Sequence, residues 1–193
     1  MTVVLLVCFL GLQAGFIWAR YAIFRIVGAT PPAIRFIEAS ATTCIVAGSF
    51  LMARRAGDDG PLDLLALAAA ACSAVMFGWA LRGIRPRQLT AAFSPDAPVE
   101  LLRTGAFRFV RNPFYLSYML AYTLPWIVSR SWWGTVLTAY MAAIYVRATL
   151  VEERKFMAGP LAGSFRIYAR DTGRFFPRPS WRARLKGDTQ HGR

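Results

Sequence analysis

LDLLALAAAACSAVMFGWAL, residues 62–81, decides the fold class because it is apolar almost from end to end. A helix that crosses the hydrocarbon core of a bilayer needs about 20 such residues, with about 17 as the practical minimum. Two further stretches, one in 2–19 and one at 36–53, meet the same criterion. The sequence therefore predicts three membrane-spanning helices in the first half of the chain.

Two shorter apolar stretches follow, FYLSYMLAYTLPWIVS at 114–129 and WWGTVLTAYMAAIYV at 132–146. Flanking aromatic residues and snorkelling arginines extend the reach of such segments. Because so few residues separate them, we expect a tight helical hairpin. The five stretches together predict an all-α integral membrane protein with about five transmembrane helices.

Composition supports this class, since 56% of the 193 residues are hydrophobic and 17% are charged. A soluble domain has about a quarter of its residues charged. A soluble helical bundle is the alternative, and three near-uniformly apolar stretches disfavour it. A cleaved signal peptide is the alternative for residues 2–19, but this stretch lacks a basic leading region and a clear small-residue cleavage site.

The cations predict the orientation of the chain in the membrane. With five spans, 20 of the 23 Lys and Arg residues fall on one side, in the loops around 20–35 and 82–111 and from 147 onward. Cytoplasmic segments of membrane proteins carry the excess of Lys and Arg. We therefore expect the N-terminus outside and the C-terminus in the cytoplasm.

The net charge of +13 also raises nucleic acid as a partner. The arginines lie at membrane edges and in the tail, and no nucleic-acid motif accompanies them, so anionic lipid is the expected partner. The single histidine is His191, and the three cysteines stand alone in apolar stretches. These features predict no metal site and no Ser-His-Asp triad. Ionisable groups are almost absent from the spans, which argues against an ion pathway; Glu38 stands at the edge of one stretch.

The remaining polar groups lie in residues 100–178. Pro113 suits the first turn of a helix, and Asn112 suits either the N-cap position or a ligand. Arg111 suits either an interfacial anchor or a binding group. Glu152 and Glu153 stand on different faces near a helix end that Gly159 and Pro160 terminate, where acids oppose the helix dipole unless a cation meets them.

The predicted hairpin places residues 111 and 152 at the same membrane face. We therefore expect Arg111 and its neighbours to supply the cations that meet the acidic pair.

The order GAFRFVRNPFYLSY, an apolar hairpin, EERKF and FRIYARDTGRFFP resembles the isoprenylcysteine carboxyl methyltransferase family, whose wider group includes membrane phospholipid methyltransferases. The resemblance covers about residues 100–178. It implies an S-adenosylmethionine-dependent methyltransferase in which this region forms a cytoplasmic cofactor pocket. It also implies a lipophilic acceptor, such as a lipid-modified molecule, that enters from the bilayer. The chain then divides into transmembrane helices 1–3 in 1–99, a methyltransferase core in 100–178, and a basic tail in 179–193.

The resemblance also implies the site residues. Those expected to bind the cofactor are Gly105, Phe107, Arg111, Asn112, Pro113, Tyr115, Glu152, Glu153 and Tyr168; those expected to act in catalysis are Arg111, Asp171 and Arg174. Several positions depart from the family pattern. Phe107 replaces a tyrosine, Asn112 a histidine and Ser117 a glycine, and Asp171 stands where arginine is common.

An anion at Asp171 repels an anionic acceptor and attracts an amine, so it disfavours a carboxylate substrate. Three alternatives to the carboxyl methyltransferase therefore remain open. They are a phospholipid or amine N-methyltransferase, a non-catalytic membrane protein on the same scaffold, and a relative that binds a nicotinamide cofactor.

Overall fold

The computed structural model describes residues 1–25, 29–55, 60–82, 84, 89–90, 93, 98 and 100–178. The expected basic tail 179–193, and the arginines expected at a membrane edge at positions 85 and 87, lie outside these residues. The described chain is almost entirely helical, and a parallel pair of two-residue strands joins Phe24–Arg25 (β1) to Leu89–Thr90 (β2).

Four long helices satisfy the length and hydropathy of a membrane span among the described residues. They are α1 (Thr2–Ala22), α2 (Pro32–Ala53), α3 (Leu62–Leu81) and α6 (Trp132–Ala158). Their outer faces carry exposed apolar side chains, including Val7, Val75 and Trp133. Exposed apolar surface on this scale needs an apolar environment. The chain is therefore an integral membrane protein, as the sequence predicts.

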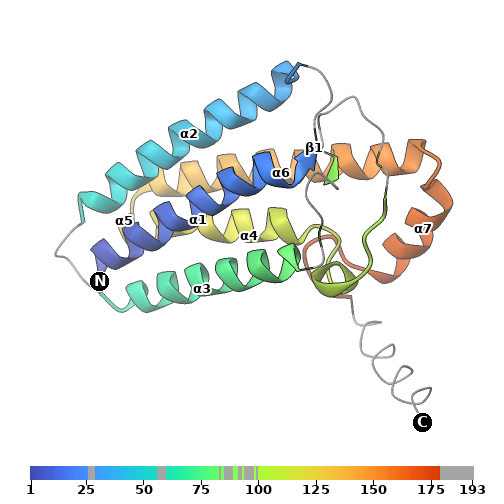
Figure 1. Ribbon diagram of the computed structural model, residues 1–193. Coiled ribbons are helices and arrows are strands. Elements are labelled where there is room, and N and C mark those ends of the chain that lie inside the picture. The colour runs from blue at the N-terminus through green and yellow to red at the C-terminus, as the bar shows by residue number, and fades with distance from the viewer. Residues whose placement is uncertain are drawn as a thin grey trace, which may run out of the picture.

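The stretch 114–129 forms two helices rather than the single helix expected from its hydropathy. The first is α4 (Pro113–Tyr122) and the second is α5 (Leu124–Ser129), with Thr123 between them. Pro125 lies in the first turn of α5, where a residue without a backbone N–H is tolerated. Within a continuous helix the same proline would remove a hydrogen bond and clash with the preceding turn, so the chain begins a new helix here. Both helices lie beside α6, which extends beyond the start of α4 toward α7 (Figure 1).

A short 3-10 helix, η1 (Gly105–Arg108), precedes α4, and α7 (Ala162–Asp171) follows α6. Gly105 begins η1 with φ of 58°, a left-handed conformation that suits glycine. Figure 1 shows η1 and α7 at the end of the bundle opposite the N-terminus. The ends of α1 and α3 and the start of α4 lie there too, so residues 103–113 and 159–174 form a cap on that end.

α5 and α6 approach each other closely at Gly134. A Cβ atom there would lie 2.8 Å from the Cα of Trp126 and 2.9 Å from the carbonyl oxygen of Pro125. These are backbone atoms, so they cannot rotate away as a flexible side chain would. The hairpin geometry therefore depends on glycine at this position.

We expect Gly134→Ala to lower the free energy of unfolding by about 1–3 kcal/mol, the range for overpacking a tight contact. The matched control is Gly78→Ala in α3, where an added Cβ meets nothing within 4 Å. Thermal unfolding of the purified protein in detergent measures both. An unchanged Gly134→Ala transition would contradict the close packing of α5 on α6.

Candidate functional site

Glu153 joins three parts of the chain at the capped end of the bundle. Its Oε1 lies 2.9 Å from Nε of Arg111, and its Oε2 lies 2.7 Å from Nη2 of Arg174. The exposed fractions of the Arg111 and Glu153 side chains are 8% and 14%. Hydrogen bonding to Glu153 raises the pKa of Arg174 above its ordinary value. The expectation that cations meet the acidic pair is therefore confirmed for Glu153.

Arg111 also binds the segment that follows α7. Its Nη1 donates to the carbonyl oxygen of Ala169 at 3.0 Å and to that of Thr172. Its backbone N–H donates to the carbonyl oxygen of Gly173 at 2.8 Å, next to an isolated parallel bridge between Val110 and Gly173. Arg111 is therefore an organising residue of the cap rather than a snorkelling anchor.

Asn112 occupies the N-cap position of α4, as the sequence predicts, but its side chain makes no capping hydrogen bond. Its Nδ2 instead donates to the carbonyl oxygen of Arg174 at 3.4 Å, and its backbone N–H donates to the same oxygen at 3.2 Å. The capping interpretation of this side chain is thus wrong. The amide is used to hold the strand-like segment 172–174.

A pocket lies beside this network, between α6, α7 and residues 100–112, and we call it the polar pocket. Its described lining is Leu89, Glu100, Leu101, Leu102, Phe107, Arg111, Asn112, Glu152, Glu153, Phe156, Phe165 and Tyr168. Phe156 and Phe165 stack with ring centroids 5.0 Å apart, and the Tyr168 hydroxyl donates to the carbonyl oxygen of Phe107 at 2.6 Å. Carboxylate, guanidinium and aromatic groups therefore converge on one small space of about 40 Å³.

Glu152 stands on another face of α6 from Glu153 and makes a different contact. It interacts with the hydroxyl of Tyr115 on α4, while the Lys155 ammonium acts on it electrostatically. Tyr115 in turn lines a second cavity of about 240 Å³ between α1, α2, α4 and α6, which we call the apolar chamber. The Glu152–Tyr115 contact therefore stands between the two spaces.

The structure gathers most of the predicted cofactor residues around the polar pocket. Phe107, Arg111, Asn112, Glu152, Glu153 and Tyr168 line it. Tyr115 lines the apolar chamber instead, and Gly105 and Pro113 set the backbone on either side of residues 106–112. Of the residues predicted to act in catalysis, Arg174 pairs with Glu153, while Asp171 at the end of α7 lines neither cavity. The chemical roles remain predictions.

Sequence reasoning missed several residues of this region. Thr172 and Gly173 contribute backbone carbonyl oxygens that accept hydrogen bonds from Arg111. A pattern of side chains in the sequence does not predict which backbone carbonyls act as acceptors. Helical spacing predicts the contact between Phe156 and Phe165 only if α6 and α7 are known to pack together. The sequence does not indicate that packing. Among the described residues, no group of three or more His, Cys, Asp or Glu side chains is placed to hold a metal ion.

The structure is thus a bundle of apolar helices, long enough to span a membrane, with a part-buried charge network and a polar pocket at one end. Residues 64–161, just over half of the chain, match the family of phospholipid methyltransferases. The chain therefore belongs to the phospholipid methyltransferase family, and its membership implies a membrane methyltransferase. Comparisons with curated proteins and with solved structures give no match.

We expect Glu153→Gln to lower the free energy of unfolding by about 2–4 kcal/mol, because it leaves Arg111 and Arg174 without their shared carboxylate. The loss stays below that of a fully buried pair because 40% of the Arg174 side chain is exposed. Glu152→Gln is the matched control, since a neutral amide still bonds the Tyr115 hydroxyl. Denaturant unfolding in detergent measures both, and equal losses would contradict the structural role of Glu153.

Proposed function

We propose that the protein is an S-adenosylmethionine-dependent methyltransferase that acts on a lipophilic acceptor within the membrane. The observation that carries this proposal is the polar pocket, in which an acidic pair, a guanidinium and aromatic rings meet at one end of the bundle. The family match covers α3 through α6 and therefore includes both glutamates and Arg111.

The donor set of the polar pocket fits this cofactor. Glu152 supplies a carboxylate for a cationic or hydroxyl-bearing group. Arg111 uses Nε and Nη1 within the protein and makes no hydrogen bond from Nη2 to a described residue, so Nη2 remains for a carboxylate. Phe107, Phe156 and Phe165 supply aromatic faces for a purine ring. The cofactor supplies an electrophilic methyl group on a sulfonium when it is bound.

The pocket must widen to hold a ligand of this size. Its present volume of about 40 Å³ is far below the roughly 300–1,000 Å³ of small-molecule sites. The cap is the part that moves in this proposal, because α7 and residues 100–112 form one wall and meet α6 through the Glu153 ion pairs and the stack of Phe156 on Phe165. Binding then favours an opened form of the cap over the closed one.

An amine is the favoured acceptor. Glu152 contacts Tyr115 at the boundary between the polar pocket and the apolar chamber, so an acceptor reaching this boundary meets a carboxylate. A carboxylate attracts an ammonium group and repels an anion. Before an ammonium attacks a methyl group it must lose a proton, and Glu152 is placed to receive it. The carboxyl-methylating alternative requires an anionic acceptor in the same position.

The same proposal includes an orientation in the membrane. The polar pocket lies at the end of the bundle that also holds the first and third inter-helix loops and α7, where the sequence concentrates its cations. We place this end in the cytoplasm and the N-terminus outside. α4 and α5 together then serve as the fourth of five crossings.

Isothermal calorimetry on the detergent-purified protein is expected to show binding of S-adenosylmethionine or its demethylated product, and no binding of NADPH. Glu152→Gln should lower the affinity for S-adenosylmethionine about 10-fold or more, which is the loss expected for one charge-assisted contact. Gly78→Ala is a control remote from the pocket. Binding of NADPH alone would replace the methyltransferase with the nicotinamide-binding alternative.

Radiolabelled methyl transfer to total membrane lipids and to a prenylcysteine analogue, side by side, separates the acceptor classes. We expect the labelled methyl group to appear in an amine lipid and to remain attached to it after treatment with base. Base-labile label confined to the prenylcysteine analogue would contradict the amine assignment and favour carboxyl methylation.

Topology is tested with single cysteines in a chain whose Cys8, Cys44 and Cys72 are replaced by alanine. Pro61→Cys, between α2 and α3, and Gly163→Cys, in α7, both occupy exposed positions. A membrane-impermeant maleimide added to intact cells should label position 61 and should label position 163 only after permeabilisation. Labelling of both positions in intact cells, or of 163 alone, would contradict the five-span orientation.

A further inference from the structure

A third cavity lies at the end of the bundle opposite the polar pocket, between the starts of α3 and α6 and the helix α5. This end also holds the N-terminus in Figure 1. The cavity has a volume of about 460 Å³, and we call it the Arg130 cavity. Apolar side chains, among them Leu62, Leu65 and Trp126, form most of its lining. Arg130 is the one charged residue in the part of this lining that the structure describes.

Arg130 ends α5 in a backbone conformation that disfavours arginine. Its φ of 50° and ψ of 31° are left-handed, and no other non-glycine residue in the described part of the chain has a positive φ. Helices that end in this conformation commonly have glycine there, because a Cβ atom is strained. Residues held in strained conformations cluster at sites that bind ligands. The presence of an arginine at this position therefore needs an explanation in its side chain.

The fold uses the guanidinium of Arg130 only weakly. Its Nη2 lies 4.0 Å from Oδ1 of Asp63, which is too long for a hydrogen bond, and the guanidinium makes no hydrogen bond to a described residue. Asp63 is held separately, since its Oδ2 accepts from the backbone N–H of Gly60 at 3.3 Å. A Cβ atom at Gly60 would collide with Nη2 of Arg130, so glycine leaves room for the guanidinium there. Of the Arg130 side chain, 31% is exposed.

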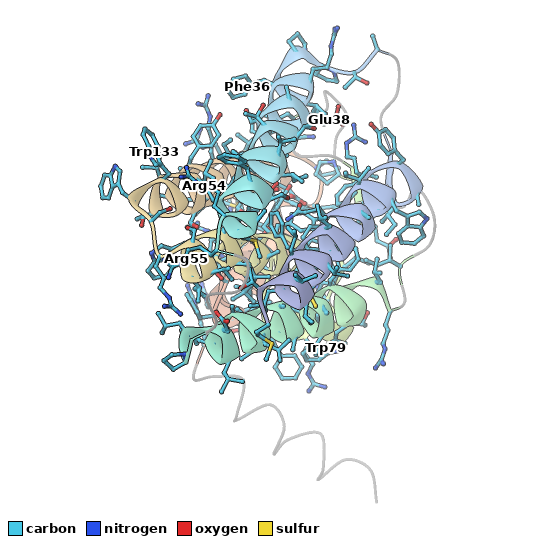
Figure 2. The ribbon with its side chains drawn as sticks, turned by 90° about the vertical axis from the view of Figure 1, so that its left-hand side faces the viewer. Phe36, Glu38, Arg54, Arg55, Trp79 and Trp133 are labelled. Atoms are coloured by element: carbon cyan, nitrogen blue, oxygen red, sulfur yellow. The ribbon has the colours of Figure 1, made fainter. Side chains whose placement is uncertain are left out.

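Tryptophans place this cavity at the depth of a membrane–water interface. Trp126 lies on α5, Trp132 and Trp133 begin α6, and all three are exposed. Figure 2 faces this end of the bundle and shows Trp133 projecting away from the helices. Tryptophan is enriched where lipid headgroups meet hydrocarbon, because its ring is apolar and its N–H is polar. A ligand in the cavity therefore meets a cation at headgroup depth and apolar side chains beside it.

These groups favour an anionic amphiphile without an amine. A guanidinium donates two parallel hydrogen bonds to a phosphate group. The start of α6, where Ser131 lines the cavity, adds a positive potential. An ammonium group would be repelled by Arg130, and the neighbouring carboxylate of Asp63, whose side chain is 3% exposed, is too deeply buried to receive it.

We propose that the Arg130 cavity binds an anionic, amine-free phospholipid whose phosphate pairs with Arg130. The acyl chains lie against the apolar lining from α3 and α5. Because this lipid has no amine and lies at the opposite end of the bundle from the polar pocket, it is a structural ligand and not a methyl acceptor. It joins the start of α3 to the hairpin of α5 and α6. This inference does not depend on the proposed function.

The first test removes the guanidinium without leaving a buried carboxylate unpaired. The double variant Arg130→Gly with Asp63→Asn also gives the left-handed position a glycine, so thermal stability without lipid should be retained or raised. Native mass spectrometry of the full chain in detergent then compares phosphatidylglycerol with diacylglycerol of the same acyl chains. Each lipid is measured on the native chain and on the variant, so that lipid bound elsewhere cancels.

We expect the double variant to bind phosphatidylglycerol about 10-fold or more weakly, which is the loss for a charge-assisted contact, and to bind diacylglycerol as the native chain does. Unchanged binding of phosphatidylglycerol, or equal losses of both lipids, overturns the proposal. Arg130→Lys keeps the charge and the pair with Asp63 but loses the planar fork. It should weaken phosphatidylglycerol about 2–10-fold, and native binding there would also contradict a paired contact with phosphate.

A second test separates ligand binding from a purely structural ion pair. Asp63→Asn alone keeps the guanidinium and removes the anion beside it, so phosphatidylglycerol should bind at least as tightly as to the native chain. A loss equal to that of the double variant would show that the ion pair only shapes the cavity. Arg54→Gln, at the C-cap of α2, removes a cation outside the cavity and should bind normally. An equal loss there would assign the binding to general surface charge.

A third test asks whether the anion belongs to a lipid or to a soluble molecule. Inorganic phosphate and glycerol phosphate are added in large excess to the native chain loaded with phosphatidylglycerol. We expect the lipid to stay bound and to raise the unfolding temperature of the native chain more than that of the double variant, because binding to the folded state stabilises it. Displacement of the lipid by either soluble anion, with equal thermal protection, overturns the lipid assignment.

Discussion

The part-buried carboxylate of Glu153 is the constraint on which the cap of this bundle depends. Two guanidiniums meet it, one from Arg111, two residues before α4, and one from Arg174 in the segment after α7. A carboxylate at this depth needs cationic or hydrogen-bonding partners, since an unpaired buried charge is far more costly than a paired one. Satisfying Glu153 therefore determines where residues 111 and 174 lie, and with them the walls of the polar pocket.

The second member of the acidic pair has a different use because of helical geometry. Successive residues of an α-helix point about 100° apart, so Glu152 cannot share the partners of Glu153. It faces α4 and the Tyr115 hydroxyl, at the border of the apolar chamber. One dipeptide thus supplies both a structural anion for the cap and a polar group for the space where two cavities adjoin.

Much of this arrangement could be predicted from the sequence, because its causes are local. Apolar length gave the long helices, Pro113 marked the start of α4, and Gly159 marked the end of α6. The meeting of Arg111 with the acidic pair followed from the hairpin. The division of residues 114–129 into two helices at Thr123 was not predicted, because a hydropathy pattern does not record the effect of Pro125 on the helix.

Other features depend on contacts distant in the chain. The side chain of Asn112 bonds a backbone carbonyl 62 residues away instead of capping its own helix. The preference of asparagine for the N-cap position reflects only residues close to it in the sequence. The carbonyl oxygen of Arg174, which binds this side chain instead, is not among them. The apolar chamber could not be predicted for the same reason, because its walls come from four helices. One of its polar residues, Gln13, interrupts a stretch that the sequence predicts as a membrane span.

The length of α6 has a consequence for how reactants reach the site. Its 27 residues extend about 40 Å, whereas the hydrocarbon core of a bilayer is about 30 Å thick. An upright helix of this length projects beyond the hydrocarbon core, and its final turns carry Glu152 and Glu153. Under the proposed function, a water-soluble donor arrives from the aqueous phase, while a lipid acceptor approaches sideways without leaving its leaflet. The proposed reaction then takes its two substrates from different phases, so their concentrations are set separately, one per volume of water and one per area of membrane.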